Sequence, residues 1–309
     1  MKYVITLIAA IILVSGFLIY QGIYLPIDSD SEETITFLVK KGEGAKEIAL
    51  NLKDQGLIRY GSFFRAYVLI YDQADKLRAG GYELSFSMNI PEIANKLVFG
   101  DRIKKIITII EGWNLKDVEK YLKEQGINLE QGLTPGLEGY LFPDTYEISP
   151  EDGINEIIKI MLDNFEKKIT PELKEKIQSQ EKTISQIITM ASLIEKEVRT
   201  PEDKKIVSGI LWKRIKAGMP LQIDATVAYI TGKKGTEILK EELEIDSPYN
   251  TYKYKGLPLG PICNPGLESI LAAIYPQESE YWFYLSTPAG ETIFSKTLKE
   301  HNAAKAKYL

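Results

Sequence analysis

Cysteine and histidine are almost absent from this chain, which contains one of each, Cys263 and His301. One cysteine cannot form a disulfide within the chain, and a single cysteine and histidine cannot supply the ligands of a structural zinc site. A Cys–His nucleophilic pair would use both residues, but Cys263 precedes Asn-Pro-Gly, which is typical of a turn that leads into a helix. We therefore disfavour the pair and exclude disulfide-stabilised and Cys/His zinc proteins.

An excess of positive charge and two common catalytic loops are also missing. The formal net charge is −5, which argues against a general nucleic-acid-binding protein. No Gly-x-Ser-x-Gly sequence occurs, so the chain lacks the nucleophile elbow of a Ser–His–Asp hydrolase, and its glycine-rich runs match no phosphate-binding loop. His301 is therefore interpreted as a hydrogen-bonding residue that lines or supports a cleft.

A long hydrophobic run occupies the N-terminus. The segment from Tyr3 to Tyr20 has no charged residue, and Tyr24 and Leu25 extend it to Pro26. This is close to the roughly 20 residues that cross a bilayer. A cleaved signal peptide is the competing interpretation, but no small-x-small cleavage sequence lies near the end of the run.

The charges that flank this run predict its orientation. Lys2 and the terminal amine lie on one side, and Asp28, Asp30, Glu32 and Glu33 lie on the other. Positive flanks stay in the cytoplasm. We therefore predict a single-pass membrane anchor over residues 1–25, an acidic linker over 26–34, and the bulk of the chain outside the cytoplasm.

Beyond the linker, the pattern predicts short strands mixed with helices. A strand–glycine–helix unit at 35–55 recurs at 106–126, either as a duplication or as two unrelated units of the same simple kind. Further helices are predicted at 62–71, 91–98, 153–170, 171–178, 184–198, 204–217, 223–230, 265–275 and 298–308, with a short strand after 79 and a β-hairpin at 281–294. Because strands and helices mix without a βαβ alternation, the predicted fold class is α+β.

One carboxylate in the predicted helix 184–198 is out of place. At roughly 100° per residue, one apolar arc of this helix contains Ile184, Ile187, Ala191, Ile194 and Val198, with Ile188 at its edge. Glu195 falls inside this arc, whereas Lys196 and Thr189 fall on the far side, where charge is expected. An inward carboxylic acid loses water, which disfavours its ionised form, and a protonated acid at neutral pH is what general acid catalysis needs.

A plainer interpretation of Glu195 is a glutamate at a helix edge that a nearby Lys or Arg neutralises. The helical pattern alone favours this interpretation. Four turns with polar groups, at 138–146, 222–226, 247–252 and 257–266, shift the balance toward a site, and the first and third of them are also rich in aromatic residues. Each turn by itself is best interpreted as a well-packed surface turn. Aromatic rings beside amide and carboxylate groups, however, suit a carbohydrate, because rings pack on sugars and polar groups bind hydroxyls.

Six motifs, in this order along the chain, resemble one known family. They are Glu-Gly-Tyr-Leu-Phe-Pro-Asp-Thr-Tyr from 138, Ala-Ser-Leu-Ile-Glu-Lys-Glu from 191, Leu-Gln-Ile-Asp-Ala-Thr-Val-Ala-Tyr from 221, Ser-Pro-Tyr-Asn-Thr-Tyr from 247, Gly-Leu-Pro-Leu-Gly-Pro-Ile from 256 and Asn-Pro-Gly from 264. Together they closely resemble the YceG-like endolytic murein transglycosylases (MltG), over nearly the whole chain. One departure is Leu259, where the family often has a second proline, and it affects loop stiffness more than chemistry.

The resemblance implies a membrane-anchored enzyme that cuts nascent peptidoglycan glycan strands internally. It implies a LysM-like α+β module at 35–105 and a larger mixed α+β catalytic domain at 106–309, outside the cell inner (cytoplasmic) membrane. Cell-wall synthases are the implied protein partners, and nucleic acid is not a partner. The catalytic glutamate of the family is the first Glu of the Glu-Lys-Glu motif, which is Glu195 here.

The implied chemistry needs one carboxylate, whereas ordinary glycosidases use two. Glu195 would protonate the oxygen of the MurNAc–GlcNAc β-1,4 bond and then accept the proton of the C6 hydroxyl, which leaves a 1,6-anhydro-MurNAc end. No metal or cofactor is needed. The residues expected to bind the sugar and to stabilise its oxocarbenium-like charge are Glu138, Gln222, Asp224, Tyr249, Asn250 and Asn264.

Two alternatives stay open. A muramidase would use water, with Glu195 as the acid and Asp224 or Glu138 as the second carboxylate. A non-catalytic scaffold for the cell-wall synthesis machinery would need only the anchor and the peptidoglycan-binding module. The inward glutamate argues against the scaffold, because a pure binding protein has little use for a carboxylate that has lost its water.

Overall fold

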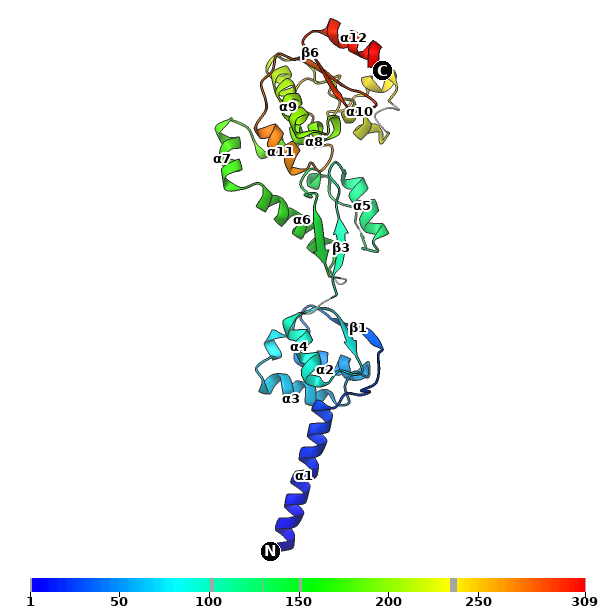
Figure 1. The fold of residues 1–309 in the computed structure, drawn as a ribbon, viewed down its shortest axis with the longest axis vertical. Helices are drawn as coiled ribbons and strands as arrows, with labels where there is room; N and C mark the ends of the chain where they lie inside the picture. The colour runs from blue at the N-terminus through cyan, green and yellow to red at the C-terminus, as the bar shows by residue number, and fades with distance from the viewer. Residues whose placement is uncertain (1, 101–102, 130, 150–151, 234–237, 309) are drawn as a thin grey trace. The chain divides into compact units, whose positions relative to one another are not determined.

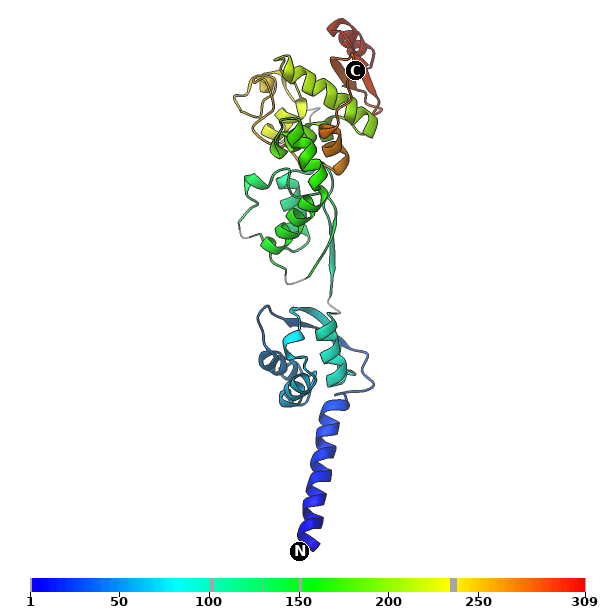
Figure 2. The same ribbon diagram turned by 90° about the vertical axis from the view of Figure 1, so that its left-hand side faces the viewer.

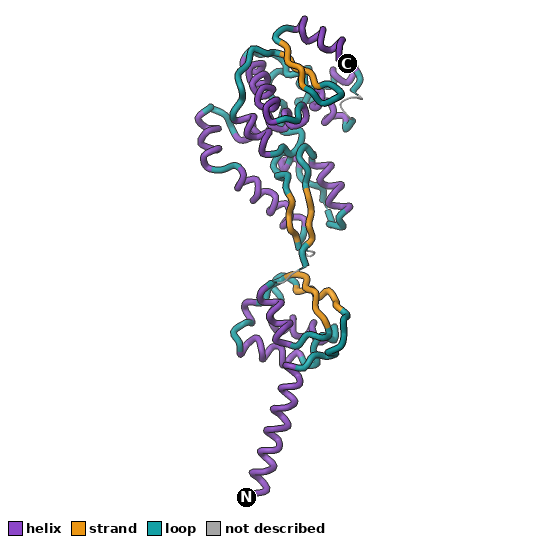
Figure 3. Tube along the Cα trace, viewed as in Figure 1, coloured by secondary structure: helices purple, strands orange, loops and turns teal. Residues whose placement is uncertain are grey.

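The structure is a computed structural model that describes residues 2–100, 103–129, 131–149, 152–233 and 238–308. The chain divides into two compact units. Unit 1 is Met1–Ile106 with Glu147–Asp152, and unit 2 is Ile107–Tyr146 with Gly153–Leu309. Figure 1 labels the helices and strands, and Figure 3 shows that both units combine helices with short strands. The predicted α+β class is confirmed.

An apolar helix, α1 (Lys2–Tyr24), opens the chain, as predicted. The segment Tyr3–Tyr24 is long and apolar enough to cross a membrane, and none of its most apolar stretch is buried inside the protein. Exposed apolar side chains such as Leu13 and Phe17 would be unfavourable in water, and a bilayer removes that cost. The helix is therefore consistent with a membrane anchor.

Unit 1 packs helices around one antiparallel strand pair. Its elements after α1 are β1 (Thr34–Val39), α2 (Ala45–Asp54), α3 (Gly61–Ile70), the 3-10 helix η1 (Ala74–Lys76), β2 (Gly80–Ser85) and α4 (Ile90–Phe99). Phe37 of β1 lies opposite Tyr82 of β2, and both side chains are fully buried. They join a core that includes Ile48 and Leu52 of α2. The LysM-like character expected of 35–105 stays a prediction.

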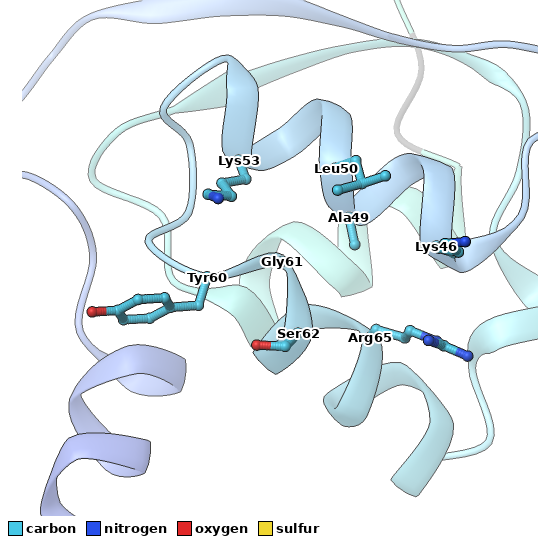
Figure 4. A pocket seen from close by; sticks show the side chains of 8 residues that line it. All are labelled: Lys46, Ala49, Leu50, Lys53, Tyr60, Gly61, Ser62 and Arg65. Atoms are coloured by element: carbon cyan, nitrogen blue, oxygen red, sulfur yellow. The ribbon is translucent and has the colours of Figure 1, made fainter.

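A shallow groove of about 340 Å³ lies between α2 and α3 (Figure 4). Its lining includes three cationic side chains, Lys46, Lys53 and Arg65, beside Leu50 and Tyr60. None of its lining residues is acidic, so it offers no carboxylate for acid–base chemistry on a sugar.

Unit 2 begins with a smaller group of elements. They are β3 (Lys105–Thr108), α5 (Leu115–Glu124), the 3-10 helix η2 (Pro135–Leu137), β4 (Thr145–Ile148), α6 (Ile154–Lys168) and α7 (Pro171–Ser179). The first two residues of β3 and the last two of β4 are assigned to unit 1. β3 pairs with β4. The sequence did not predict β4, because a strand of four residues beside a proline-containing turn gives too short an alternation to recognise.

The centre of unit 2 is α8 (Ile184–Glu197). It packs against α7, α9 (Pro201–Lys216), α10 (Asp224–Thr231) and α11 (Leu267–Ile274), and Figures 1 and 2 show α8 and α11 side by side. All residues from 187 to 194 are buried. Thr189, which the pattern placed on an exposed side, is 3% exposed, so that prediction was wrong. A helix with neighbours on every side does not obey a one-face pattern.

The remaining elements of unit 2 lie after α10. They are the 3-10 helix η4 (Lys240–Glu244), the antiparallel pair β5 (Phe283–Ser286) and β6 (Thr292–Ser295), and α12 (Leu298–Tyr308). The predicted hairpin and terminal helix are confirmed. The His301 ring stacks on Phe283 at a centroid distance of 5.4 Å, so this histidine packs α12 against the hairpin.

Candidate active site

Glu195 lies in the last turn of α8, which begins at a capping box. Thr183 Oγ1 accepts a hydrogen bond from the backbone N–H of Gln186, whose side chain accepts one from the Thr183 N–H. The Glu195 side chain is only 9% exposed. Its Oε2 accepts hydrogen bonds from the Gly266 N–H (2.9 Å) and the Ser269 hydroxyl (2.7 Å). The structure thus places the Glu195 side chain in the interior of unit 2, as the helical pattern predicted.

A buried cation faces the other oxygen of Glu195. Lys204 Nζ of α9 lies 3.3 Å from Glu195 Oε1, and the Lys204 side chain is 4% exposed. This is the neutralising lysine that the plainer interpretation anticipated. The pattern of α9 could have revealed it, because Lys204 precedes the buried Val207, Ser208 and Leu211 by three, four and seven positions. The ion pair does not exclude catalysis, since a carboxylate deep in a protein needs donors in any role.

A second carboxylate that the sequence did not indicate lies beside this site. Glu111 is on the turn between β3 and α5, and a Cβ added to Gly266 would overlap its Oε1 and lie 2.6 Å from its Oε2. Glu111 is exposed to solvent, but partial burial of its carboxyl, followed by the charge of Glu195, raises its pKa, while Lys204 acts in the opposite direction. No periodic pattern marks Glu111, because turns have no repeating face.

Glu138 is buried, with 4% exposure. Its Oε2 accepts hydrogen bonds from the Leu115 N–H (3.3 Å) and from the Tyr229 hydroxyl (3.1 Å), and among the described residues its Oε1 has no partner. Burial raises its pKa to about 7, and these two hydrogen bonds oppose the rise. The Tyr229 ring lies 5.1 Å from the Tyr249 ring, so Glu138 and the predicted Tyr249 belong to one group.

The two predicted asparagines are fully buried, and their side chains bind backbone. Asn264 accepts from the Leu141 N–H and donates to the Trp113 carbonyl, both at 3.0 Å. Asn250 donates to the carbonyls of Leu243 and Ile245, and it accepts from the Tyr252 N–H. Both amides therefore fix the loops around them. Asn264 does so two positions before Gly266, which contacts Glu195.

Gln222 and Asp224 are exposed at the start of α10. The Gln222 N–H donates to the Thr251 carbonyl (3.1 Å), and Asp224 accepts a hydrogen bond from the Tyr252 hydroxyl. These contacts bring the 222–224 segment against the 249–252 segment. Within the described ranges, no hydrogen bond or ion pair joins Gln222, Asp224, Tyr249 or Asn250 to Glu195. The part of the chain that the structure describes also contains no group of three or more His, Cys, Asp or Glu suited to a metal ion.

Comparison with known sequences decides the family. The sequence model of the YceG-like family matches residues 37–307. The chain belongs to the YceG-like family. This confirms the resemblance carried by the six motifs, and the match covers most of this YceG-like protein, including Glu195 and Glu111.

Several relatives of this YceG-like protein carry a functional name. The endolytic murein transglycosylase of Bacillus subtilis is 34% identical over 97% of this chain and 91% of its own. The endolytic murein transglycosylase of Streptococcus pneumoniae strain D39 is 28% identical over 97% of this chain and 63% of its own. A crystal structure of a YceG-like protein from Listeria monocytogenes is 32% identical, covers 89% of this chain and all of that one, and has a TM-score of 0.57.

Proposed function

We propose that this YceG-like protein is a lytic transglycosylase that cuts peptidoglycan, with Glu195 as its acid–base residue. The observation that carries the proposal is the Glu195 carboxylate itself. It is almost buried, yet it faces three donors, from Gly266, Ser269 and Lys204. A carboxylate held this firmly at a loop-rich site is positioned for proton transfer. The names of the Bacillus and Streptococcus relatives support the reaction class.

The proposed substrate bond is the β-1,4 bond between MurNAc and GlcNAc. Glu195 donates a proton to the glycosidic oxygen as the bond from MurNAc C1 breaks. The C6 hydroxyl of the same MurNAc then bonds to C1, and its proton returns to Glu195. The product is a 1,6-anhydro-MurNAc end, and no water is consumed. Because the nucleophile is part of the substrate, no protein carboxylate is needed as the nucleophile or to activate a water, and the attack costs little entropy.

The other predicted residues divide by exposure into two roles. Glu138, Asn250 and Asn264 are buried and fix loops, so we assign them the positioning of the sugar-binding segments. Asp224 and Gln222 are exposed, and we assign them direct contacts with the glycan together with the half-buried Tyr249. Charged and amide groups in such contacts would stabilise the oxocarbenium-like charge.

We further propose an endolytic enzyme that acts close to where strands are made. α1 anchors the chain as a single pass in the inner (cytoplasmic) membrane with unit 2 outside, and the acidic residues after α1 support this orientation. An enzyme held at the membrane meets nascent strands before they mature, so its cuts limit strand length. Cell-wall synthases, which make these strands, are the protein partners that this placement favours.

The variant Glu195→Gln tests the proposal. Glutamine keeps the shape of the side chain but cannot transfer a proton, so we expect release of anhydro-ended glycans from uncrosslinked strands to fall roughly 100-fold or more, while strand binding persists. Glu197→Gln, which changes the other glutamate of the motif, is the matched control and should retain activity. Wild-type activity in Glu195→Gln would remove Glu195 from the mechanism.

Mass spectrometry of the products separates the rival functions. A muramidase that uses Asp224 or Glu138 as a second carboxylate adds one water per cut, whereas a lytic enzyme adds none. A non-catalytic scaffold leaves the chain-length profile of the strands unchanged.

A further inference from the structure

Two carboxylates converge on one glycine of unit 2. The Gly266 N–H donates to Glu195 Oε2, and the space where a Cβ of residue 266 would lie is taken by the Glu111 carboxylate. Gly266 has ordinary extended backbone angles (φ −71°, ψ 166°), so the backbone conformation does not require glycine here. A Cβ at this position would instead force the Glu111 carboxylate to move away from Gly266.

The backbone holds Glu111 in this place. The next residue, Gly112, donates its N–H to the Asn264 carbonyl (2.9 Å), and the Asn264 N–H donates to the Trp113 carbonyl (2.8 Å). The Asn264 side chain adds a third bond to the same Trp113 carbonyl. On the other side, Lys196 Nζ donates to the Gly112 carbonyl (3.0 Å). A turn tied by four hydrogen bonds fixes where the Glu111 side chain starts.

Charge balance at this site favours one shared proton. Three charged groups act on Glu111 from the elements around it, which are Glu195 of α8, Lys204 of α9 and Glu268 of α11. The exposed Lys196 of α8 lies nearby, on the carbonyl of Gly112. Glu111 and Glu268 are exposed to solvent, whereas the side chains of Glu195 and Lys204 are 9% and 4% exposed. Glu195 and Glu111 are grouped by their convergence on Gly266, and with the buried Lys204 ammonium they form a group that is neutral when the two carboxylates hold one proton between them.

The donors around Glu195 decide where that proton rests. The Gly266 N–H and the Lys204 ammonium can only donate, so Glu195 acts as an acceptor toward both. Glu111 has no hydrogen bond or ion pair within the described residues. Partial burial and then the charge of Glu195 raise the pKa of Glu111, so its surroundings favour the protonated form, while Lys204 acts in the opposite direction.

We propose that Glu111 is a second catalytic residue, which shares a single proton with Glu195 and supplies it for the cleavage step. This rests on the function proposed above. In the resting enzyme the proton lies on Glu111. It reaches the glycosidic oxygen through the pair as the C1–O bond breaks, and the C6 hydroxyl, when it bonds to C1, returns one proton to the pair. The pair ends as it began, and no water or other reactant is consumed.

The test is Glu111→Gln in the full-length protein in detergent, with uncrosslinked glycan strands as the substrate. We expect kcat to fall roughly 100-fold with KM changed less than about two-fold, because acid–base catalysis is lost while strand binding is kept. In the wild type, the proton that Glu111 and Glu195 share leaves only at higher pH, because its loss leaves two adjacent negative charges. In Glu111→Gln, the alkaline limb of the kcat/KM profile should therefore move to lower pH by about one unit.

Two further variants exclude a merely structural effect. Glu111→Asp keeps a carboxylate on a shorter side chain, and it should recover part of the activity and the wild-type position of the alkaline limb. Glu268→Gln removes the exposed neighbouring charge and should leave kcat and the limb unchanged. Wild-type kcat and an unmoved limb in Glu111→Gln would overturn the proposal, as would a fall in kcat with no movement of the limb.

A measurement that does not depend on activity separates this proposal from the proposed function. Carbon-13 NMR of the Glu111 side-chain carboxyl should show a pKa above its ordinary value in the wild type and a lower pKa in Glu195→Gln, because the charge of Glu195 is one cause of the rise. Identical titrations in both would overturn the pair even if the wild type cuts glycans. A wild type without anhydro products would overturn the lytic function, while the titration would still decide whether the carboxyls share a proton.

Discussion

At the scale of single residues, the structure places more than one carboxyl group where water is scarce. Burial raises the pKa of Glu138 to about 7, and the same cause raises that of Glu197 to about 7 against a hydrogen bond from Tyr284. The unfolded chain ionises these groups near their ordinary value of 4.5. As pH rises from about 4.5 to 7, the unfolded state loses its protons before the folded state does, so the free energy of unfolding falls.

Glu138→Gln tests this coupling. The neutral amide can accept the hydrogen bonds of Leu115 and Tyr229, so it removes the ionisation and keeps the shape. For Glu138 the pH-dependent loss is on the order of 3 kcal/mol. We expect the variant to melt a few degrees higher than the wild type at pH 8 and close to it at pH 5. Equal differences in Tm at both pH values would show that Glu138 does not ionise in this range.

The sequence indicated some of these residues and not others. Glu195 was recognisable because helical periodicity gives each position a direction, and the buried Lys204 on α9 follows from the same periodicity. Glu111 lies on a turn, and only tertiary contacts bring it to Gly266. The burial of Asn250 and Asn264 also depends on tertiary contacts. Their side-chain amides form hydrogen bonds with backbone groups of loops that have no regular backbone partners.

At the scale of elements, local rules predicted most helices of unit 2 but not their surroundings. The ends of α8 and α12 follow from caps and periodicity, and the structure places them within one residue of the prediction. The exposure predicted for Thr189 failed because α8 is covered by four other helices. Sequence periodicity reports one buried face, and the second face of a central helix comes from neighbours that are distant in the sequence.

The loop that opens α11 allows a test of how Glu111 is positioned. In Gly266→Ala the new Cβ must displace the Glu111 carboxylate, while the backbone N–H can still donate to Glu195. We expect kcat to fall roughly ten-fold or more with an unchanged Tm. The double variant with Glu111→Gln should be no slower than Glu111→Gln alone, because both changes remove the same group.

The control for this experiment is Gly136→Ala. Gly136 has open space around its Cβ position, so the substitution should leave kcat unchanged. Losses in Gly266→Ala and Glu111→Gln that multiply in the double variant would contradict the explanation, because they would mean that Gly266 acts independently of Glu111.

At the scale of the whole molecule, one buried thiol makes the predicted topology measurable. Cys263 is fully buried, and its Sγ donates to the Ser192 carbonyl. Burial raises its pKa well above the ordinary value. A thiol without solvent contact or thiolate character reacts slowly with maleimides. An engineered cysteine at an exposed site is therefore the only group that such a reagent should label in the folded protein.

Glu32→Cys uses this property to test the orientation of the anchor. Glu32 is exposed and follows α1 in the acidic segment that we place outside the cytoplasm. In spheroplasts, we expect a membrane-impermeant maleimide to label Glu32→Cys completely. Lys2→Cys, at the opposite end of α1, should be labelled only after detergent is added, and the wild type should stay unlabelled in both conditions. Labelling of Lys2→Cys but not of Glu32→Cys in spheroplasts would place unit 2 in the cytoplasm, where it could not reach an extracytoplasmic glycan.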